Sequence, residues 1–208
     1  MPQNLQATCT YQQIWALAIS AAGQTQDNVN YKDSVLLQTF FAAELRDIWN
    51  KEAWPELCDN LTQVAVANNV FSTNVGQPDE MGDILGLYPV DPRISHCWER
   101  FKSTDWWLGD GQVHFRPNLG NVWVDYQLPV VDLLDPSLIG QANEATLMAV
   151  TLPQRFRLPL AWRGAGRLLG TEDPALASQL IKFAEIELAR QASGVKVPWW
   201  RISEAVRE

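Results

Sequence analysis

The two histidines are the first residues to consider for catalysis, because a serine or cysteine nucleophile needs a base within hydrogen-bond reach. His96 is followed directly by Cys97, but neighbouring side chains in an extended segment point to opposite faces, which argues against a direct pair. His114 lies between Val113 and Phe115, and this alternation predicts an outward polar position on a half-buried strand. The sequence therefore predicts no nucleophilic catalytic residue.

Carboxylates and glycines also lack the spacing of a metal or phosphate site. Asp79, Glu80 and Asp83 lie close together, but three carboxylates leave a hard cation short of its about six oxygen ligands, which favours a solvated loop. The stretch RGAGRLLG at 163–170 lacks the lysine and the serine or threonine of a phosphate-binding loop. Its small residues indicate a place where another helix approaches closely. We expect no metal and no cofactor.

Tryptophan is abundant, with ten copies in 208 residues, and it is typical both of sugar-stacking platforms and of buried protein contacts. A glycosidase needs two carboxylates about 5 to 10 Å apart, and Asp105 and Asp110 flank Trp106 and Trp107. Consecutive residues of a strand face opposite sides, however, so these two rings cannot form one platform. Carbohydrate binding stays a distant alternative, and protein contacts are favoured.

The composition indicates a folded chain that does not bind nucleic acid tightly. Hydrophobic residues make up 47% and charged residues 19%, which is too apolar for a disordered chain. The formal net charge of -8 argues against neutralisation of phosphates, although an acidic wall lets DNA pass without sticking. Cys9, Cys58 and Cys97 are an odd number at wide spacing, which predicts free thiols. No apolar run reaches about 18 residues, so we expect no membrane span.

The first third of the chain predicts two antiparallel helices packed on each other. In residues 10–22, Ile14, Leu17 and Ala21 share one stripe, and Gly23 suits the C-terminal cap.

The second helix begins at Asp33 or Ser34, either of which can cap the first turn, and ends at Trp54-Pro55. The residues predicted to face the core are Leu37, Phe41, Leu45, Ile48 and Trp49. The residues predicted to lie on the other side are Glu44, Arg46, Asp47 and Lys51.

The middle of the chain changes to the period of two that is typical of strands. Candidate strands lie at 64–67, 84–90 and 121–128. The clearest hairpin is STDWWLGDGQVHFR, in which Asp110-Gly111 supplies the residues of a tight turn. These strands predict a small antiparallel sheet of about four strands.

The last third predicts helices again. The segment 153–169 is interrupted by Pro159, where we expect the helix proper to start. Asp173-Pro174 is typical of the start of the next helix, and Gly194 suits its end. The predicted apolar face of that last helix consists of Leu176, Leu180, Phe183, Ala184 and Leu188.

This order predicts an α+β fold, a helical bundle of N- and C-terminal helices with an inserted antiparallel sheet. The predicted segments are the N-terminal helices at 1–59, the β insertion at 60–134, the C-terminal helices at 135–194 and an extended arm at 195–208.

Several segments together resemble neck proteins that tailed bacteriophages encode among their head genes. LRDIWNKEAWPELCD at 45–59 is similar to the N-terminal helix of those proteins. GDILGLYPVDPR at 82–93 comes next, then the hairpin, the strand NVWVDYQLP at 121–129 and a closing helix at 174–192. The resemblance extends from about residue 10 to residue 192, and none of its motifs is catalytic.

The resemblance implies a head-to-tail adaptor, or connector, which is a structural protein and not an enzyme. Such adaptors form a homo-oligomeric ring, usually a dodecamer, that docks beneath the portal protein and contacts tail or tail-terminator proteins. The ring lines the channel for DNA ejection, and the DNA passes through its lumen without specific binding. The implied location is the neck of the virion, assembled in the host cytoplasm.

A C-terminal arm commonly reaches the portal in such adaptors, and VKVPWWRISEAVRE at 195–208 matches it by position. The portal-binding residues implied are Val197, Pro198, Trp199, Trp200, Arg201 and Ile202. Trp199, Trp200 and Ile202 would be the anchors and Arg201 would add polar contacts, because buried aromatic residues and arginine tend to dominate interface energetics. Two alternatives stay open: another neck or tail component, such as a tail-terminator or head-completion protein, and, more distantly, a carbohydrate-binding module of a phage tail.

Overall fold

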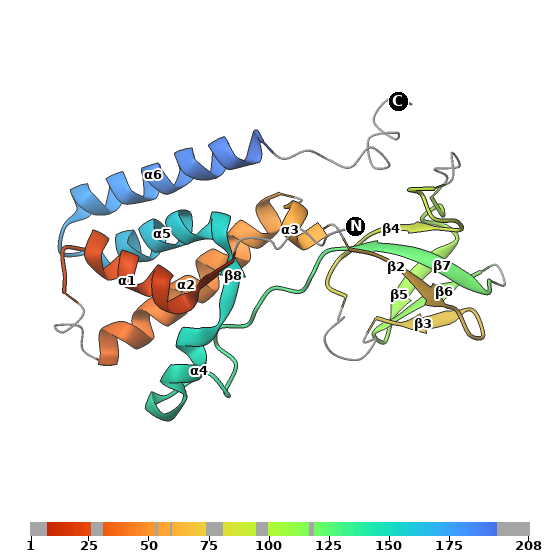
Figure 1. Cartoon of the computed structure of the whole chain (residues 1–208), viewed down its shortest axis with the longest axis horizontal. Helices are drawn as coiled ribbons and strands as arrows, with labels where there is room; N and C mark the ends of the chain where they lie inside the picture. The colour runs from red at the N-terminus through yellow and green to blue at the C-terminus, as the bar shows by residue number, and fades with distance from the viewer. Residues whose placement is uncertain are drawn as a thin grey trace. The chain divides into compact units, whose positions relative to one another are not determined.

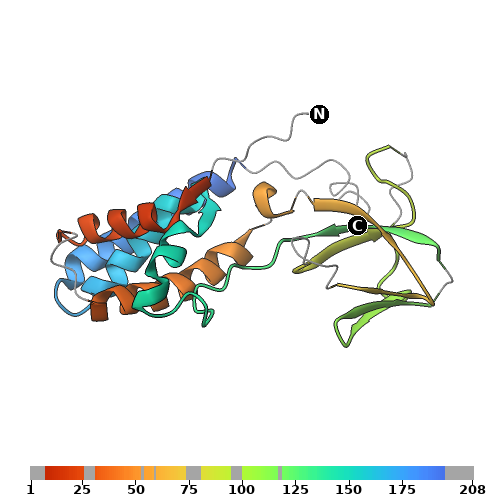
Figure 2. The same cartoon turned by 60° about the horizontal axis from the view of Figure 1, so that its bottom comes forward.

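The chain folds into two compact units, each seen in Figures 1 and 2. Unit 1 lies within residues 1–52 and 131–194 and consists mainly of helices, and unit 2 lies within 53–130 and consists mainly of strands. The predicted α+β class is confirmed. The computed structural model describes residues 8–25, 31–52, 54–58, 60–73, 81–94, 100–116 and 119–194.

Unit 1 is a helical bundle with a small strand pair. Its helices are α1 (Tyr11–Ala21), α2 (Tyr31–Lys51), α4 (Glu144–Ala149), α5 (Arg157–Leu169) and α6 (Pro174–Ala192), with short 3-10 turns at Gln141–Asn143 and Gln154–Phe156. The strands β1 (Thr8–Thr10) and β8 (Thr151–Pro153) pair antiparallel and join the first segment of the unit's sequence to the second. Within the described part of the chain, no helix combines the length and the hydropathy needed to cross a membrane.

The helix α5 lies at the centre of unit 1, because α1, α2 and α6 all pack against it. The helices α1 and α2 meet where the rings of Tyr11 and Phe41 form an edge-to-face pair, with centroids 5.5 Å apart. Their larger contacts are nevertheless with α5. The predicted contact between these two helices is present, but each packs more extensively on α5, which lies more than 100 residues later in the chain.

Two glycines let the other helices approach α5 closely, as the sequence predicted. A Cβ added at Gly164 would overlap the buried ring of Phe41 in α2. A Cβ added at Gly166 would lie 2.8 Å from Cγ1 of Ile181 and 3.0 Å from the carbonyl oxygen of Ala177 in α6. The small residues of α5 thus face two different helices.

The ends of the helices follow their capping residues. Thr10 and Gln13 form a capping box at the start of α1, and Gly23 follows its end with φ of +73°. At the start of α6 the carboxylate of Asp173 accepts a 3.0 Å hydrogen bond from the main-chain N–H of Leu176, and Pro174 occupies the first helical position. The predicted Gly23 and Asp173-Pro174 caps are confirmed.

Three helix boundaries differ from the prediction. The helix α2 begins at Tyr31, before Asp33, and ends at Lys51, before Trp54-Pro55. The helix α5 begins at Arg157, two residues before Pro159. Proline fits there because the first turn contains N–H groups that have no partner within the helix.

The buried faces of the first two helices agree with the sequence to different degrees. All five predicted core residues of α2 are buried. In α1, Ile14 is buried but Leu17 and Ala21 are half-buried, because the buried side is centred on Tyr11, Ala18 and Ile19.

Unit 2 contains two separate three-stranded antiparallel sheets, where the sequence predicted a single sheet of about four strands. One sheet has the order β2-β7-β4 and the other has the order β3-β6-β5. The elements of unit 2 are α3 (Pro55–Cys58), β2 (Asn60–Ala65), β3 (Val70–Ser72), β4 (Ile84–Tyr88), β5 (Trp106–Gly109), β6 (Gln112–Phe115) and β7 (Asn121–Tyr126). Unit 2 includes α3 because the N–H of Leu128 donates to the carbonyl oxygen of Leu57 at 2.8 Å.

Turns with positive φ connect strands both within one sheet and between the two sheets. Asp110 and Gly111 have φ of 52° and 70° in the β5–β6 turn, which confirms the predicted hairpin. Asn68 and Asn69 have φ of 54° and 65°, and they turn the chain from β2 in one sheet into β3 in the other. The sequence did not predict β3, because a strand of three residues is too short to show alternation.

The core of unit 2 lies between these sheets and is built from alternating residues of their strands. Its buried members are Val66, Phe71, Met81, Leu87, Val113, Phe115, Val122, Val124 and Tyr126. Trp106 packs against this cluster from β5.

Replacement of Gly164 by alanine is expected to destabilise unit 1 by about 2 kcal/mol, because the buried ring of Phe41 must move. The measurement is urea unfolding followed by far-ultraviolet circular dichroism, which reports mainly on the helices. Gly170→Ala is the matched control, since Gly170 is exposed and has a helical φ of -49°, and we expect it to leave the midpoint unchanged or slightly raised. Equal midpoints for the two variants would contradict the close approach of α2 to α5.

Candidate functional site

The residues that the resemblance assigns to portal binding lie outside the described part of the chain. These are Val197, Pro198, Trp199, Trp200, Arg201 and Ile202. The same holds for four residues considered for chemistry, namely Asp79, Glu80, His96 and Cys97. The assignments made for all of them stay predictions.

The ring of His114 is held by its own hairpin. It stacks on Trp107, its cross-strand partner, with centroids 5.1 Å apart and planes 7° apart, and its Nε2 lies 3.3 Å from the carbonyl oxygen of Gly109. Trp106 faces the core while Trp107 is 49% exposed. The prediction that these two tryptophans cannot share one stacking platform is confirmed.

Within the described part of the chain, Cys9 is a candidate for a thiol nucleophile, but its surroundings keep the thiol protonated. Burial raises the pKa of its thiol to about 11, and the positive charge of Arg157 lowers it by a smaller amount. The Sγ lies 3.6 Å from the carbonyl oxygen of Leu152 in the adjoining strand β8. A thiolate is the reactive form of cysteine, so Cys9 serves the β1–β8 contact.

The most concentrated group of charges in unit 1 surrounds the buried guanidinium of Arg163 in α5. Its Nη1 donates to Oε2 of Glu44 at 2.8 Å and also to Asp47, both in α2. Its Nη2 donates to Glu185 in α6. One arginine therefore connects three helices.

Two further cations complete this group. Nε of Arg167 donates to Oε1 of Glu44 at 2.8 Å, and Nζ of Lys51 donates to Oε2 of Glu185 at 2.7 Å. Glu44 is 7% exposed and receives both arginines. We call the six residues, namely Lys51, Arg163, Arg167, Glu44, Asp47 and Glu185, the ionic cluster. It contains three charges of each sign.

The pKa values in the ionic cluster follow from these contacts. Burial alone would lower the pKa of Arg163, but its hydrogen bonds to Asp47 and Glu185 and the nearby carboxylate charges raise it above the ordinary value. The hydrogen bond from Lys51 is the main cause that lowers the pKa of Glu185, and Arg163 adds to it. Each shift favours the charged form, so the ionic cluster is suited to fixing helices and not to exchanging protons.

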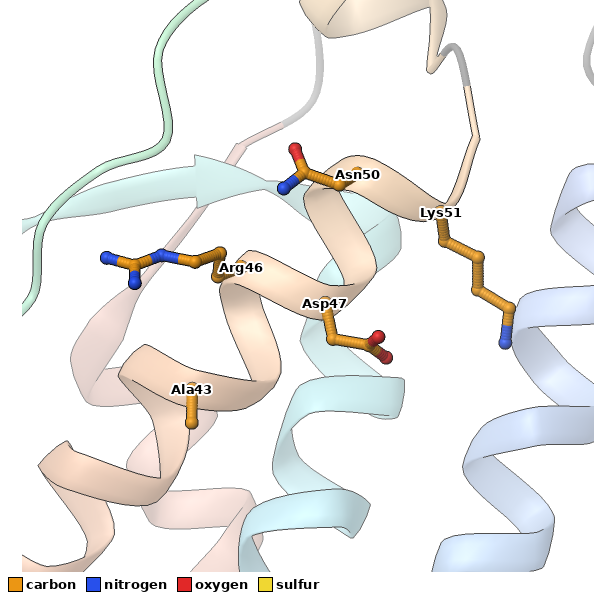
Figure 3. A pocket seen from close by; sticks show the side chains of 5 residues that line it. All are labelled: Ala43, Arg46, Asp47, Asn50 and Lys51. Carbon is orange, nitrogen blue, oxygen red and sulfur yellow. The ribbon is translucent and has the colours of Figure 1, made fainter.

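Two hollows lie beside the ionic cluster. One, of about 370 Å³, is lined by Ala43, Ile181 and all the cluster residues except Lys51. The other, of about 460 Å³, is lined by five residues of α2, and Figure 3 shows Arg46 and Lys51 extending to opposite sides of that helix. Among the described residues, no group of histidine, cysteine, aspartate or glutamate is arranged to hold a metal ion.

A second candidate is an apolar surface shared by α5 and α6. Phe183 is 51% exposed and Ile186 is 56% exposed, and both belong to α6. The ring of Phe183 lies 6.2 Å from that of Trp162 in α5, and Leu158 is exposed one turn before Trp162. We call Leu158, Trp162, Phe183 and Ile186 the α5–α6 apolar surface.

The contact between Trp162 and Phe183 joins the two helices at this surface, and α5 and α6 are antiparallel neighbours. Arg163 in α5 bonds to Glu185 in α6. Gly166 follows Arg163 in α5 but lies close to Ile181, which precedes Glu185 in α6, so the two helices run in opposite directions. Leu158 precedes Trp162 in α5, and Ile186 follows Phe183 in α6. Both therefore lie toward the same end of the helix pair.

Sequence reasoning misplaced two residues of these candidates. Phe183 was predicted in the core, but the buried face of α6 consists of Ala177, Leu180, Ala184 and Leu188. Since consecutive helical residues are about 100° apart, Phe183 is turned away from Ala184. Glu44 was predicted on the solvent side, but it is buried against the arginines. The small residues Ala177 and Ala184 were the available signal for the contact face.

Comparison with protein-family models gave no match, and comparison with curated proteins gave none either.

Replacement of Arg163 by methionine is expected to lower the stability of unit 1 by about 3 kcal/mol, because Glu44 then stays buried with fewer partners. Urea unfolding followed by circular dichroism measures the loss. Arg190→Met is the matched control, since Arg190 forms an exposed pair with Glu187 within one helix, and we expect no measurable change. A loss as small as that of the control would show that the ionic cluster does not hold the helices.

The stabilising effect of Glu185 is expected to depend on pH. Its pKa is lowered in the folded state below the ordinary value of 4.5 for glutamate, so its contribution is complete above that value and disappears as the pH falls through the folded pKa. The difference in urea midpoint between the wild type and Glu185→Gln should therefore be constant from about pH 7 to about pH 5.5 and shrink below about pH 4.5. A difference that does not shrink at all as the pH falls below about 4.5 would contradict the ion pairs with Lys51 and Arg163.

Proposed function

We propose that this chain is a structural protein of a tailed-bacteriophage virion, a head-to-tail adaptor whose ring joins the portal to the tail and surrounds the DNA exit channel. The proposal begins with the resemblance of residues 45–59, 82–93, 121–129 and 174–192 to neck proteins. In this role the chain acts by binding and not by catalysis.

The α5–α6 apolar surface is the observation that carries the proposal. Exposed apolar clusters on a folded unit are typical of protein interaction sites, and aromatic anchors contribute most to such contacts. The surface is held on two helices that the ionic cluster connects to each other and to α2, so it is rigid before a partner arrives. A rigid surface loses little entropy on binding, which suits the repeated contacts of a ring.

The charge of the chain supports the passage of DNA. Residues 53–130 contain ten aspartates and glutamates but four lysines and arginines. Tight binding of DNA depends on cations that replace its counterions, so an acidic lining leaves the packaged DNA free to move. The arm at 195–208 contains the aromatic pair Trp199 and Trp200, and we assign it to the portal.

The first test replaces Phe183 and Ile186 together by serine. We expect the circular dichroism spectrum of the wild type, because both side chains are more than half exposed, together with loss of rings when the variant is mixed with the portal protein of the same phage and viewed by electron microscopy. The control, Gln179→Ser with Lys182→Ser, lies on the exposed side of the same helix and should form rings. Normal rings from the first variant would contradict the role of the α5–α6 apolar surface.

The second test deletes residues 195–208. We expect an unchanged fold and loss of docking to the portal protein, measured by co-sedimentation. Normal docking of the truncated chain would contradict the proposed arm. Docking of the full chain to tail proteins but not to portal would identify a tail-terminator or head-completion protein instead.

A further inference from the structure

The strand β5 is the edge of a sheet and has an unused hydrogen-bonding side. It pairs with β6, which pairs in turn with β3, so the order of this sheet is β3-β6-β5. The pairing of Trp106–Gly109 with Gln112–Phe115 is regular, with no bulge. Natural proteins usually protect such an edge with lysine, proline or a bulge, because its free N–H and C=O groups recruit another strand.

The phase of the hairpin shows which groups are free. In a hairpin with a two-residue turn, the residues that flank the turn form a hydrogen-bonded pair, and such pairs recur at every second position. Gly109–Gln112 and Trp107–His114 are therefore the bonded pairs. The main-chain groups of Trp106 and Leu108 point away from β6, and outside that ladder neither residue has a main-chain hydrogen bond within the described part of the chain.

The side chains beside this edge are also apolar and exposed. Leu108 is 59% exposed, and the half-exposed Trp107 is supported on one side by the parallel ring of His114. Consecutive strand residues face opposite sides, and Trp106 packs against the core, so Leu108 lies on the core side of the sheet and Trp107 on the outer side. An added strand with alternating apolar residues would cover Leu108 with those residues and place the residues between them beside Trp107. Backbone and side chains thus favour the same kind of partner, an extended strand with alternating apolar residues.

The charges at the two ends of β5 indicate which strand fits. Asp105 precedes the strand and Asp110 follows it. A basic strand would gain from the same carboxylates, and the excess of acidic residues in 53–130 acts in the same direction.

We propose that β5 is a docking edge for an extended strand of a partner protein in which apolar residues alternate with lysine or arginine. This interaction is separate from the ring contact of the α5–α6 apolar surface and does not rest on the adaptor role.

The test uses the full chain labelled with ¹⁵N and an acetylated, amidated peptide of sequence Val-Lys-Val-Lys-Val-Lys-Val as the probe. We expect saturable shifts of the amide resonances of Trp106 and Leu108 at peptide concentrations up to about 2 mM. The corresponding Val-Glu peptide should bind at least about fivefold more weakly, because its charges repel Asp105 and Asp110.

Variants of β5 test whether the peptide pairs with the main chain of the strand or only lies near it. Leu108→Pro removes an N–H that lies outside the β5–β6 ladder, a change that edge strands tolerate, and it should weaken binding about fivefold or more. Leu108→Val keeps the N–H and should bind within about twofold of the wild type. Asp110→Asn keeps a side chain that accepts the positive φ of this position and should weaken the Val-Lys peptide about twofold.

The outcomes are distinguishable. Absence of shifts at Trp106 and Leu108, or equal binding of the Val-Lys and Val-Glu peptides, would overturn the proposal. Self-association of the wild type that Leu108→Pro abolishes, without peptide binding, would overturn it in favour of a second copy as the occupant. If Leu108→Pro does not fold, the peptide pair and Asp110→Asn decide, and the ring assay on the α5–α6 apolar surface is unaffected by any of these results.

Discussion

The charge of Arg163 is buried in the middle of a helical bundle, and the arrangement of unit 1 depends on how that charge is compensated. Moving a guanidinium out of water costs several kcal/mol, which only well-placed hydrogen bonds recover. Here the partners are Glu44 and Asp47 in α2 and Glu185 in α6. Each helix must therefore present one definite side to α5. The next residue, Gly164, removes the side chain that would keep Phe41 of α2 at a distance.

This constraint explains why apolar residues remain on the surface of α6. Glu185 must face Arg163, and at about 100° per residue Phe183 then lies about 160° away from it around the helix. Ile186 falls on the exposed side as well, where it is 56% exposed. Repacking Phe183 into the core would turn Glu185 away from Arg163 and leave that charge uncompensated. The ionic cluster thus maintains the α5–α6 apolar surface, which links the stability of the bundle to its proposed use in assembly.

Local patterns predicted what local interactions decide. The spacing from Leu37 to Trp49 identified the core side of α2, and Asp110-Gly111 and Asp173-Pro174 identified a hairpin and a helix start that the structure confirms. The ionic cluster escaped prediction because Glu44 and Arg163 are 119 residues apart. A glutamate within a helix ordinarily indicates a solvated side, and no periodicity records a distant arginine.

The division of the strands into two sheets escaped prediction for a related reason. Period-two alternation identifies strands but not their partners, and β2 pairs with β7, some 60 residues later in the chain. The Asn68-Asn69 turn was the local signal, since asparagine tolerates positive φ, but the three residues of β3 were too few to show alternation. For the arm at 195–208, the portal as partner was assigned from the resemblance alone.

The perturbed ionisable groups discussed for unit 1 are each held in one charge state at neutral pH. In enzymes such groups tend to sit in a cleft with a pKa moved toward neutrality. Here burial raises the pKa of Cys9 and of Tyr11, so both stay protonated at neutral pH. The ion pairs of Arg163 and Glu185 move their pKa values away from neutrality as well. Groups with pKa values shifted in this way keep their charge states over a wide range of pH, which would suit the proposed structural role.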